Sequence, residues 1–146
     1  MPNVRRVSPL EAKGLVDEGY TYVDVRTVEE FEVRHPAGAL NVPFARPSSA
    51  DAGEGGTFLS VMRRLFRPEA KIVVGCATGA RSLRAAETLA DAGFANVVDQ
   101  RAGLLGARSP FGALTEEGWK AVGLPTSSGP DEGSYGALLA GRAALS

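Results

Sequence analysis

The sequence predicts an α/β domain with a central, mostly parallel β-sheet of about five strands and helices on both faces. Segments with helix signals alternate along the chain with short segments rich in β-branched and apolar residues, and no internal repeat is visible. The 146 residues are enough for one compact domain around a single hydrophobic core. Together these observations favour a single-domain α/β protein.

The first quarter of the chain carries well-marked element boundaries. Residues 8–11 read Ser-Pro-Leu-Glu, which is the order of a capping box with proline in the first helical turn, and Gly19 offers a stop for that helix. Residues 20–25 are rich in β-branched and aromatic side chains, so we expect a strand there. Residues 27–30 read Thr-Val-Glu-Glu and repeat the capping-box order, which predicts a short second helix.

The middle of the chain is predicted to contain a loop followed by a helix. Residues 44–57 hold prolines, serines and glycines typical of a loop, which is a candidate for setting substrate specificity. Residues 58–66 place apolar side chains at helical intervals with arginines between them, and Pro68 closes the helix.

The second half continues the alternation of strands and helices. Residues 71–75 form a short apolar stretch typical of a buried parallel strand, and residues 82–92 contain strong helix formers before a glycine. We expect a further strand at 97–99 and a further helix at about 115–122.

The domain is predicted to end near residue 125. Residues 126–146 form a C-terminal tail of linker-like composition, in which residues 137–145 could form a small helix. The domain proper would then comprise residues 1–125.

Composition and charge exclude several classes of partner. The chain is 44% apolar and 23% charged with a formal net charge of -1, which gives no reason to expect a nucleic-acid partner. No long apolar run follows the arginines near the N-terminus, so we expect neither a secretory signal nor a membrane partner, and we expect a cytoplasmic protein. A single cysteine, Cys76, excludes an intrachain disulfide and suits a reducing compartment.

Cys76 stands between the predicted strand at 71–75 and the helix that follows it. Ligands of open α/β sheets bind at this carboxyl edge, where loop N–H groups and the positive end of the helix dipole form an anion site. A thiolate is such an anion, and Arg81 follows in the same loop, so we expect Cys76 to be a nucleophile. Gly79 allows the loop to turn tightly. The candidate site comprises Cys76 and the binding loop Ala77, Thr78, Gly79, Ala80, Arg81 and Ser82.

Three motifs in the same order give the chain a family resemblance. The loop Cys-x-x-Gly-x-Arg-Ser of residues 76–82 resembles the active-site loop of single-domain rhodanese-like sulfurtransferases of the thiosulfate sulfurtransferase type. Residues 23–26, Val-Asp-Val-Arg, with Glu30 and Phe31 resemble a second motif of that family, and residues 35–43, His-Pro-Ala-Gly-Ala-Leu-Asn-Val-Pro, resemble a third. The resemblance implies a rhodanese-like fold for the chain.

The resemblance also implies a mechanism. Cys76 would attack the outer sulfur of a small anionic donor, such as thiosulfate, polysulfide or a persulfide, and become a persulfide. A thiophilic acceptor, either cyanide or a thiol such as glutathione or thioredoxin, would then take that sulfur. The loop N–H groups would stabilise the charge on the terminal sulfur, and neither a metal nor an organic cofactor is implied.

Loop length separates this chemistry from a related one. Phosphatases and arsenate reductases with a similar architecture use a longer loop, His-Cys-x-x-x-x-x-Arg, because a phosphoryl group needs a wider cradle. Here four residues separate Cys76 from Arg81, and Gly75 stands where those enzymes place histidine. Sulfur is therefore favoured over phosphate, although phosphatase or arsenate reductase activity stays an alternative. A sulfane-sulfur-binding or redox-sensing module without fast turnover is another.

Several residues have competing interpretations. Arg81 could bind an anionic donor or pair with an acidic neighbour. Asp24 and Arg26 are expected to support the site by holding neighbouring backbone or each other. His35, the only histidine, is expected to be structural, as is Trp119.

The sequence departs from the family pattern after the last predicted strand. Residues 100–103, Gln-Arg-Ala-Gly, keep one glycine of the Gly-Gly pair that the family often has here. Extra residues in 105–117 place Gly118-Trp119 later in the chain than the family pattern does. This second segment could also set specificity. Candidates for a basic rim around the site are Arg46, Arg101 and Arg108.

Overall fold

A five-stranded parallel sheet forms the centre of the molecule. The computed structural model describes residues 4–44 and 56–140, and its main sheet has the strand order β1-β6-β5-β2-β4 with every neighbouring pair parallel. Its strands are β1 (Arg5–Val7), β2 (Thr21–Asp24), β4 (Leu40–Asn41), β5 (Lys71–Gly75) and β6 (Asn96–Gln100). The predicted fold class is confirmed, and β5 lies in the middle of the sheet.

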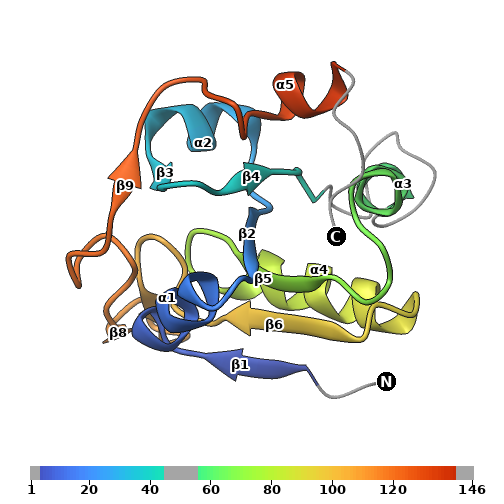
Figure 1. Cartoon of the computed structure of the whole chain (residues 1–146). Coiled ribbons are helices and arrows are strands. Elements are labelled where there is room, and N and C mark those ends of the chain that lie inside the picture. The colour runs from blue at the N-terminus through green and yellow to red at the C-terminus, as the bar shows by residue number, and fades with distance from the viewer. Residues whose placement is uncertain (1–3, 45–55, 141–146) are drawn as a thin grey trace.

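Helices cover both faces of this sheet. They are α1 (Pro9–Asp17), α2 (Val28–Val33), α3 (Gly56–Leu65), α4 (Ala80–Asp91) and α5 (Tyr135–Leu139). Figure 1 shows α1 in front of the sheet and α4 behind it. The side chains of β5 alternate accordingly: Val73 belongs to the apolar cluster that contains Ala12 of α1, whereas Ile72 and Val74 belong to the cluster beneath α3 and α4.

Both predicted capping boxes are present. The Ser8 hydroxyl accepts a hydrogen bond from the Glu11 N–H at 3.1 Å, and the Glu11 carboxylate accepts one from the Ser8 N–H at 2.8 Å. Thr27 and Glu30 repeat the arrangement at the start of α2. The two helix starts could be predicted from the sequence because both hydrogen bonds of each capping box form between residues three positions apart.

The predicted helix at 115–122 is wrong. Residues 107–108 and 114–116 instead form a small antiparallel hairpin, β7 (Ala107–Arg108) and β8 (Leu114–Glu116), and turns follow it. Gly118 explains the difference, because a Cβ there would lie 2.5 Å from the Leu104 carbonyl oxygen. This glycine permits a close backbone approach that the helical pattern of its neighbours does not reveal.

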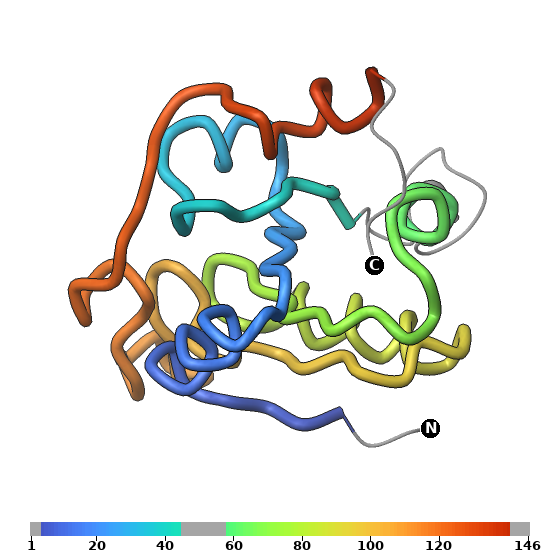
Figure 2. The backbone as a smooth tube through the Cα atoms, viewed as in Figure 1, coloured from blue at the N-terminus to red at the C-terminus, as the bar shows by residue number. Residues whose placement is uncertain are grey.

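The segment after residue 125 packs on the rest of the molecule. Its strand β9 (Thr126–Ser127) pairs antiparallel with β3 (His35–Pro36), and the side chain of Leu138 in α5 is buried in the cluster beneath α3 and α4. Figure 2 shows the segment running past α2 to α5. The predicted helix at 137–145 corresponds to α5, which begins earlier; residues 141–146 and most of the predicted loop at 44–57 lie outside the described residues.

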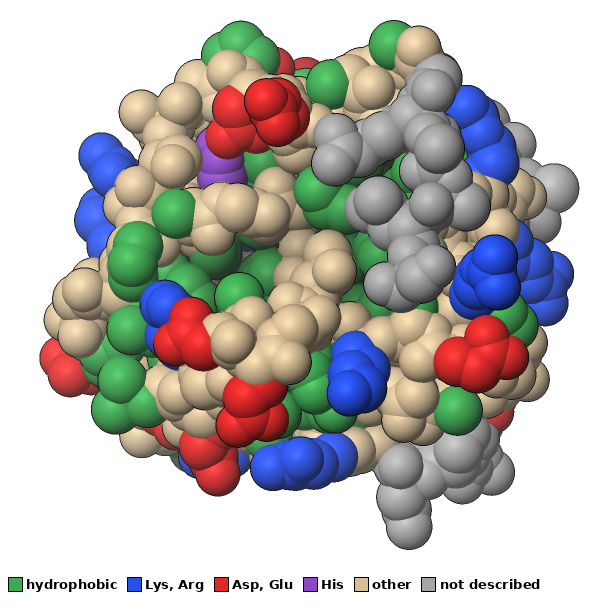
Figure 3. Space-filling model, viewed as in Figure 1, with side chains coloured by type: hydrophobic (Ala, Val, Ile, Leu, Met, Phe, Trp, Pro, Cys, Tyr) green, Lys and Arg blue, Asp and Glu red, His purple; other side chains and the backbone are tan. Residues whose placement is uncertain are grey.

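Charged side chains of both signs are mixed over the surface that Figure 3 shows, and neither sign dominates that face. In the described part of the chain, no helix has the length and apolar character needed to cross a bilayer.

Candidate active site

Cys76 follows β5 directly, at the carboxyl edge of the sheet, and its loop leads into α4. Gly79 is the N-terminal cap of α4 and has a φ of 104°, a left-handed conformation that favours glycine. A Cβ on Gly79 would also lie 2.1 Å from the Arg101 carbonyl oxygen. The turn from strand to helix therefore requires glycine at this position for two separate reasons.

The Cys76 sulfur lies inside this loop. Its Sγ accepts hydrogen bonds from the backbone N–H groups of Gly79 at 3.1 Å and Ser82 at 3.3 Å, and its S–H donates to the Ser82 hydroxyl at 3.4 Å. Cys76 as a whole is 3% exposed. Backbone donors aimed at one atom from the first turn of a helix form a site suited to negative charge on that atom.

The other loop residues divide between buried backbone and exposed side chains. Ala77 is buried, and its carbonyl oxygen accepts a hydrogen bond from the Leu105 N–H at 2.9 Å. Thr78 and Ala80 are exposed and face a neighbouring cleft.

Residues 103–105 pack against the active-site loop and donate hydrogen bonds to its carbonyl oxygens. The Leu104 N–H donates to the Cys76 carbonyl oxygen at 2.8 Å, parallel to the bond from Leu105 to Ala77. Gly103 makes this close approach possible, because a Cβ there would lie 2.4 Å from the Ala77 carbonyl oxygen. The single glycine kept from the family's usual pair is therefore the one that contacts the active-site loop.

Gln100 holds the turn that carries Gly103, a role that the sequence did not reveal. Its side chain is fully buried, and its Oε1 accepts the N–H groups of Ala102 and Gly103, both at 2.9 Å. Its Nε2 donates to the Gly103 carbonyl oxygen at 3.0 Å and to the Tyr22 hydroxyl at 3.2 Å. No pattern in the sequence distinguishes this glutamine from an exposed one at the end of a strand.

Arg81 pairs with an acidic neighbour, one of its two interpretations. Its guanidinium donates to the two carboxylate oxygens of Glu30 at 2.8 Å and 3.1 Å. The bond from Arg81 is the largest cause that lowers the pKa of Glu30 to about 2, and the bonds from Thr27 add to it. The same pairing raises the pKa of Arg81. Arg81 thus ties the start of α4 to α2.

Asp24 and Arg26 hold each other in a buried pair. Arg26 donates to both carboxylate oxygens of Asp24, with the shortest distance 2.8 Å, and to the Arg34 carbonyl oxygen at 2.6 Å. The Asn41 amide donates to the carbonyl oxygens of Asp24 and Arg26, both at 3.0 Å. This pair fixes the connection after β2, the strand beside β5.

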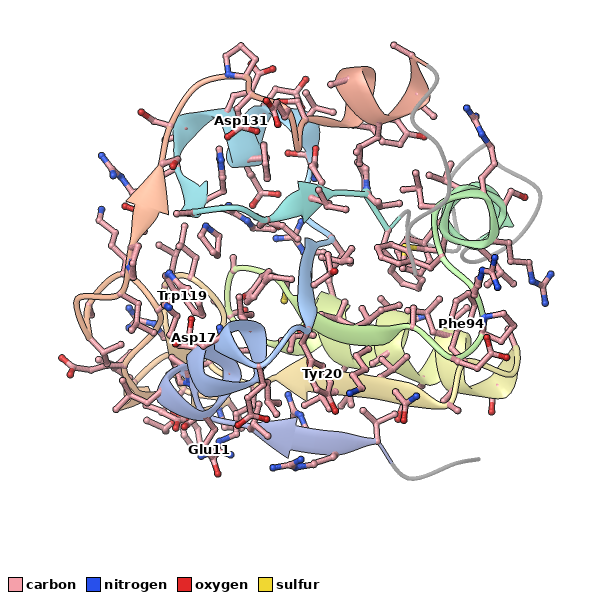
Figure 4. The ribbon with its side chains drawn as sticks, in the orientation of Figure 1. Glu11, Asp17, Tyr20, Phe94, Trp119 and Asp131 are labelled. Carbon is pink, nitrogen blue, oxygen red and sulfur yellow. The ribbon has the colours of Figure 1, made fainter. Side chains whose placement is uncertain are left out.

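The structure gives His35 a structural environment. Its ring stacks on that of Phe31 with 3.6 Å between centroids, its Nδ1 lies 2.7 Å from the Phe31 carbonyl oxygen, and its Nε2 lies 2.8 Å from Asp131. Figure 4 shows Asp131 on the C-terminal segment, where this segment passes α2. Trp119 is also buried, and its indole N–H donates to the Pro125 carbonyl oxygen.

A cleft of about 530 Å³ lies beside the loop, between Thr78 to Ala80 and the β7–β8 hairpin. Its lining includes Arg6, Arg101 and Arg108, so two of the three predicted rim arginines converge there; Arg46 lies outside the described residues. Arg101 pairs with Glu116 at 2.9 Å. The described residues contain no cluster of three His, Cys, Asp or Glu side chains that could hold a metal ion.

Fold and site together define an α/β protein with a cysteine in an N–H-lined loop at the carboxyl edge of a parallel sheet. The family model of the rhodanese-like domain matches residues 8–106. The chain therefore belongs to the rhodanese-like domain family.

Relatives and solved structures agree with this assignment. Thiosulfate sulfurtransferase 16 of Arabidopsis thaliana, a chloroplastic protein, is 35% identical over 122 residues, which cover 84% of this chain and 92% of the relative. Senescence-associated protein DIN1 of Raphanus sativus is 39% identical over 88 residues; the match covers 60% of this chain and 48% of DIN1, so the chain spans about half the length of that relative.

Among solved structures, a protein from M. tuberculosis superposes with a TM-score of 0.68 and 26% identity over 88% of this chain and 100% of its own. A polysulfide-sulfur transferase homodimer from Wolinella succinogenes has a TM-score of 0.61 and 23% identity over 86% and 79%, which shows a shared fold.

Proposed function

We propose that the chain is a sulfurtransferase that carries sulfane sulfur on Cys76 from a small anionic donor to cyanide or a thiol. The observation that carries the proposal is the position of the Cys76 sulfur, which accepts N–H hydrogen bonds from Gly79 and Ser82 within the loop of residues 76–82. Relatives named thiosulfate sulfurtransferase support the same reaction class.

The residue before Cys76 favours sulfur over phosphate as the cargo. A Cβ on Gly75 would lie 1.8 Å from the Tyr22 hydroxyl oxygen, so the histidine of the phosphatase motif has no room at this position. Tyr22 is buried, and burial raises the pKa of its phenol, which therefore stays a neutral packing group at physiological pH. The Tyr22 side chain therefore occupies the position that the histidine of a phosphatase-type loop would need.

The proposed reaction has two displacements at sulfur. With thiosulfate, the Cys76 thiolate attacks the outer sulfur, a new S–S bond forms, the donor's S–S bond breaks, and sulfite leaves with its electron pair. In the second step cyanide attacks the terminal sulfur of the persulfide, which gives thiocyanate and restores the thiolate. A thiol such as glutathione or thioredoxin would instead leave as a persulfide. Backbone N–H groups stabilise the anionic sulfur in both steps.

Mass spectrometry tests the first step directly because the chain has one cysteine. Treatment with thiosulfate or polysulfide should add one sulfur atom on the peptide that contains Cys76, and cyanide should remove it. The Cys76→Ser variant should gain no sulfur and should have no thiosulfate:cyanide activity. A Cys76→Ser variant that keeps full activity, while circular dichroism shows it folded, would disprove the proposal.

The cleft beside the loop is the proposed approach route for the donor. Arg108 lies on its wall and donates to the Gly112 carbonyl oxygen, with no carboxylate partner among residues 4–44 and 56–140. Arg108→Ala should raise KM for thiosulfate a few-fold and weaken its salt dependence, with kcat unchanged. Arg67→Ala is the matched control, because Arg67 is exposed before the amino end of β5 and should have no effect.

A screen of acceptors separates a transferase from a sensor. A transferase should pass the sulfur to at least one of cyanide, dithiothreitol, glutathione and thioredoxin with repeated turnover. A Cys76 persulfide that forms but passes its sulfur to none of them would favour a sulfur-binding or redox-sensing module instead. Turnover of an aryl phosphate or of arsenate would favour the phosphatase or arsenate reductase alternative.

A further inference from the structure

Exposed apolar side chains gather on the segment that follows the family match. The family model ends at residue 106, and the hairpin of β7 and β8 comes directly after it. Six large apolar side chains are exposed in the described residues, and three of them are Leu105, Phe111 and Leu114. Phe111 is 97% exposed. Single exposed apolar residues are ordinary on a protein surface, but a group of them is typical of a binding surface.

This segment lies beside the active-site loop. The Leu105 N–H donates to the Ala77 carbonyl oxygen at 2.9 Å, and Figure 1 shows β8 beyond the carboxyl end of β6. Arg108 stands opposite Leu114 across the hairpin, so the two side chains share one face. Arg108 also lines the cleft of about 530 Å³ next to Thr78 to Ala80. We use the term hairpin surface for the side chains of Leu105, Arg108, Phe111 and Leu114.

Hydrogen bonds hold the turn that carries Phe111. The Ser109 hydroxyl oxygen accepts the N–H groups of Phe111 and Ala113, both at 3.2 Å. The Ser109 N–H donates to the Ala113 carbonyl oxygen at 2.8 Å, and Arg108 donates to the Gly112 carbonyl oxygen at 3.0 Å. The backbone that presents Phe111 is therefore ordered before any partner binds, which lowers the entropy lost on binding.

The charge on the cleft wall indicates the kind of partner. Arg6 pairs with the buried carboxylate of Asp99. Arg101 pairs with Glu116. Arg108 uses a guanidinium N–H on a carbonyl of the turn, keeps further donors, and has no carboxylate partner in the described part of the chain. A carboxylate on a partner would pair with Arg108, while apolar side chains of the partner would cover those of the hairpin surface.

Two other occupants fit the hairpin surface less well. In a two-fold dimer built on this surface the same patch faces itself, so the Arg108 side chains of the two copies would meet. A membrane surface is recognised by clusters of basic side chains. On the hairpin surface there is one arginine, and the net charge of the chain is -1. A protein segment with apolar and acidic side chains is the occupant that matches both the apolar residues and the arginine.

We propose that the hairpin surface docks a protein that accepts sulfur from Cys76, through a segment in which apolar and acidic side chains flank the acceptor cysteine. The acceptor thiolate attacks the outer sulfur of the Cys76 persulfide and a new S–S bond forms on the acceptor. The persulfide bond breaks, the outer sulfur keeps its proton, and Cys76 leaves as a thiolate with the electron pair. The sulfur step rests on the proposed function, whereas docking does not require it.

Two fluorescent peptides test docking without sulfur chemistry. Each has serine at the acceptor position and leucines beside it; one carries aspartates, and in the other lysines replace the aspartates. Fluorescence anisotropy should show tighter binding of the aspartate peptide, and Phe111→Ala should weaken that binding about tenfold. Arg108→Ala should remove most of the preference for the aspartate peptide. Val33→Ala is the matched control, because Val33 is 76% exposed on α2, and it should change nothing.

The same peptides with cysteine at the acceptor position test sulfur transfer. The protein is first loaded with thiosulfate, and mass spectrometry then follows the loss of sulfur from Cys76. Transfer to the aspartate peptide should be about tenfold slower in Phe111→Ala than in wild type. Transfer to cyanide should be unchanged, because so small an acceptor needs no docking surface. Phe111 is exposed at a turn, so the variant should fold normally.

The cyanide reaction shows which proposal fails. If cyanide removes the sulfur normally while Phe111→Ala and wild type serve the aspartate peptide equally, docking is wrong and the proposed function stands. If thiosulfate adds no sulfur to Cys76, the proposed function is wrong and the anisotropy result decides docking alone. Equal binding of the two peptides by wild type would overturn docking. So would self-association of the chain that Phe111→Ala abolishes in sedimentation, because the occupant would then be a second copy.

Discussion

Glu30→Gln should loosen the active-site loop from α2 without removing the cap of that helix. Glu30 accepts two hydrogen bonds from Arg81 and also accepts the N–H of Thr27 at 3.0 Å. Glutamine keeps an oxygen for the cap, as capping boxes allow, but it has no charge and offers only one acceptor atom to the guanidinium. The substitution therefore isolates the ion pair.

The pKa of Glu30 sets the size of the effect. A fall from the ordinary 4.5 to about 2 corresponds to at most roughly 3.4 kcal/mol of differential stabilisation. The Glu30 side chain is 36% exposed, so solvent screening reduces the net contribution to about 1 kcal/mol. Glu30→Gln should lower Tm by about 3 °C.

The pH dependence has a definite sign. Because folding depresses the pKa of Glu30, its contribution is complete above the unfolded value of 4.5 and is lost as pH falls toward the folded value of about 2. The difference in free energy of unfolding between wild type and Glu30→Gln should be constant between about pH 6 and 8 and should lose more than half its size by about pH 3.

Urea unfolding at several pH values measures this difference. Glu29→Gln is the control, because Glu29 is exposed in the same helical turn. We expect the control to change the free energy of unfolding by only a few tenths of a kcal/mol. A Glu30→Gln deficit that is the same at pH 7 and pH 3, or one matched by Glu29→Gln, would refute the assigned role of the ion pair.

Three further predictions concern close contacts. Gly75→Ala should destabilise the protein by about 1–3 kcal/mol, because its Cβ would lie 1.8 Å from the Tyr22 hydroxyl oxygen, and Tyr22→Phe in the same chain should restore part of the loss in urea unfolding. Gly103→Ala should abolish most sulfur transfer in the thiosulfate:cyanide assay, since its Cβ would collide with the Ala77 carbonyl oxygen and displace the loop. Asp131→Ala should speed amide hydrogen exchange of residues 126–140 by roughly tenfold through loss of the contact with the buried histidine, with the rates at Ala77 unchanged.

Local signals predicted more of the fold than of the site's support. Capping boxes, the buried strand at 71–75 and the loop from Cys76 are written in short stretches of sequence, and the structure places them where they were expected. The prediction of a helix at 115–122 was wrong because the backbone at Gly118 packs closely against the Leu104 carbonyl group. The local helical pattern of residues 115–122 contains no sign of this contact. Propensity cannot register such a tertiary contact.

The roles of Gln100, Asp99 and Arg81 near the active-site loop also depend on tertiary contacts, so the sequence did not reveal them. Gln100 and Asp99 lie at the end of a strand that looks ordinary, yet both are buried. Gln100 donates to the Gly103 carbonyl oxygen, and Asp99 accepts a hydrogen bond from Arg6, which also donates to the Gly79 carbonyl oxygen of the loop. The two interpretations of Arg81 could be separated only once Glu30 lay within 2.8 Å of it. Side-chain partners distant in sequence decide these roles, and a single sequence does not encode their distances.

The loop that surrounds the Cys76 sulfur is held in place through its carbonyl groups. The carbonyl oxygens of Cys76 and Ala77 accept bonds from Leu104 and Leu105, and that of Gly79 accepts one from Arg6 at 3.2 Å. In a planar trans peptide the C=O and the following N–H point in opposite directions. Bonds that hold these carbonyls therefore also fix the planes of the peptides that carry the N–H groups of Ala77, Thr78 and Ala80. Because the bonds form on folding, the site needs little reorganisation when negative charge arrives, which is the condition under which such donors stabilise a transition state most.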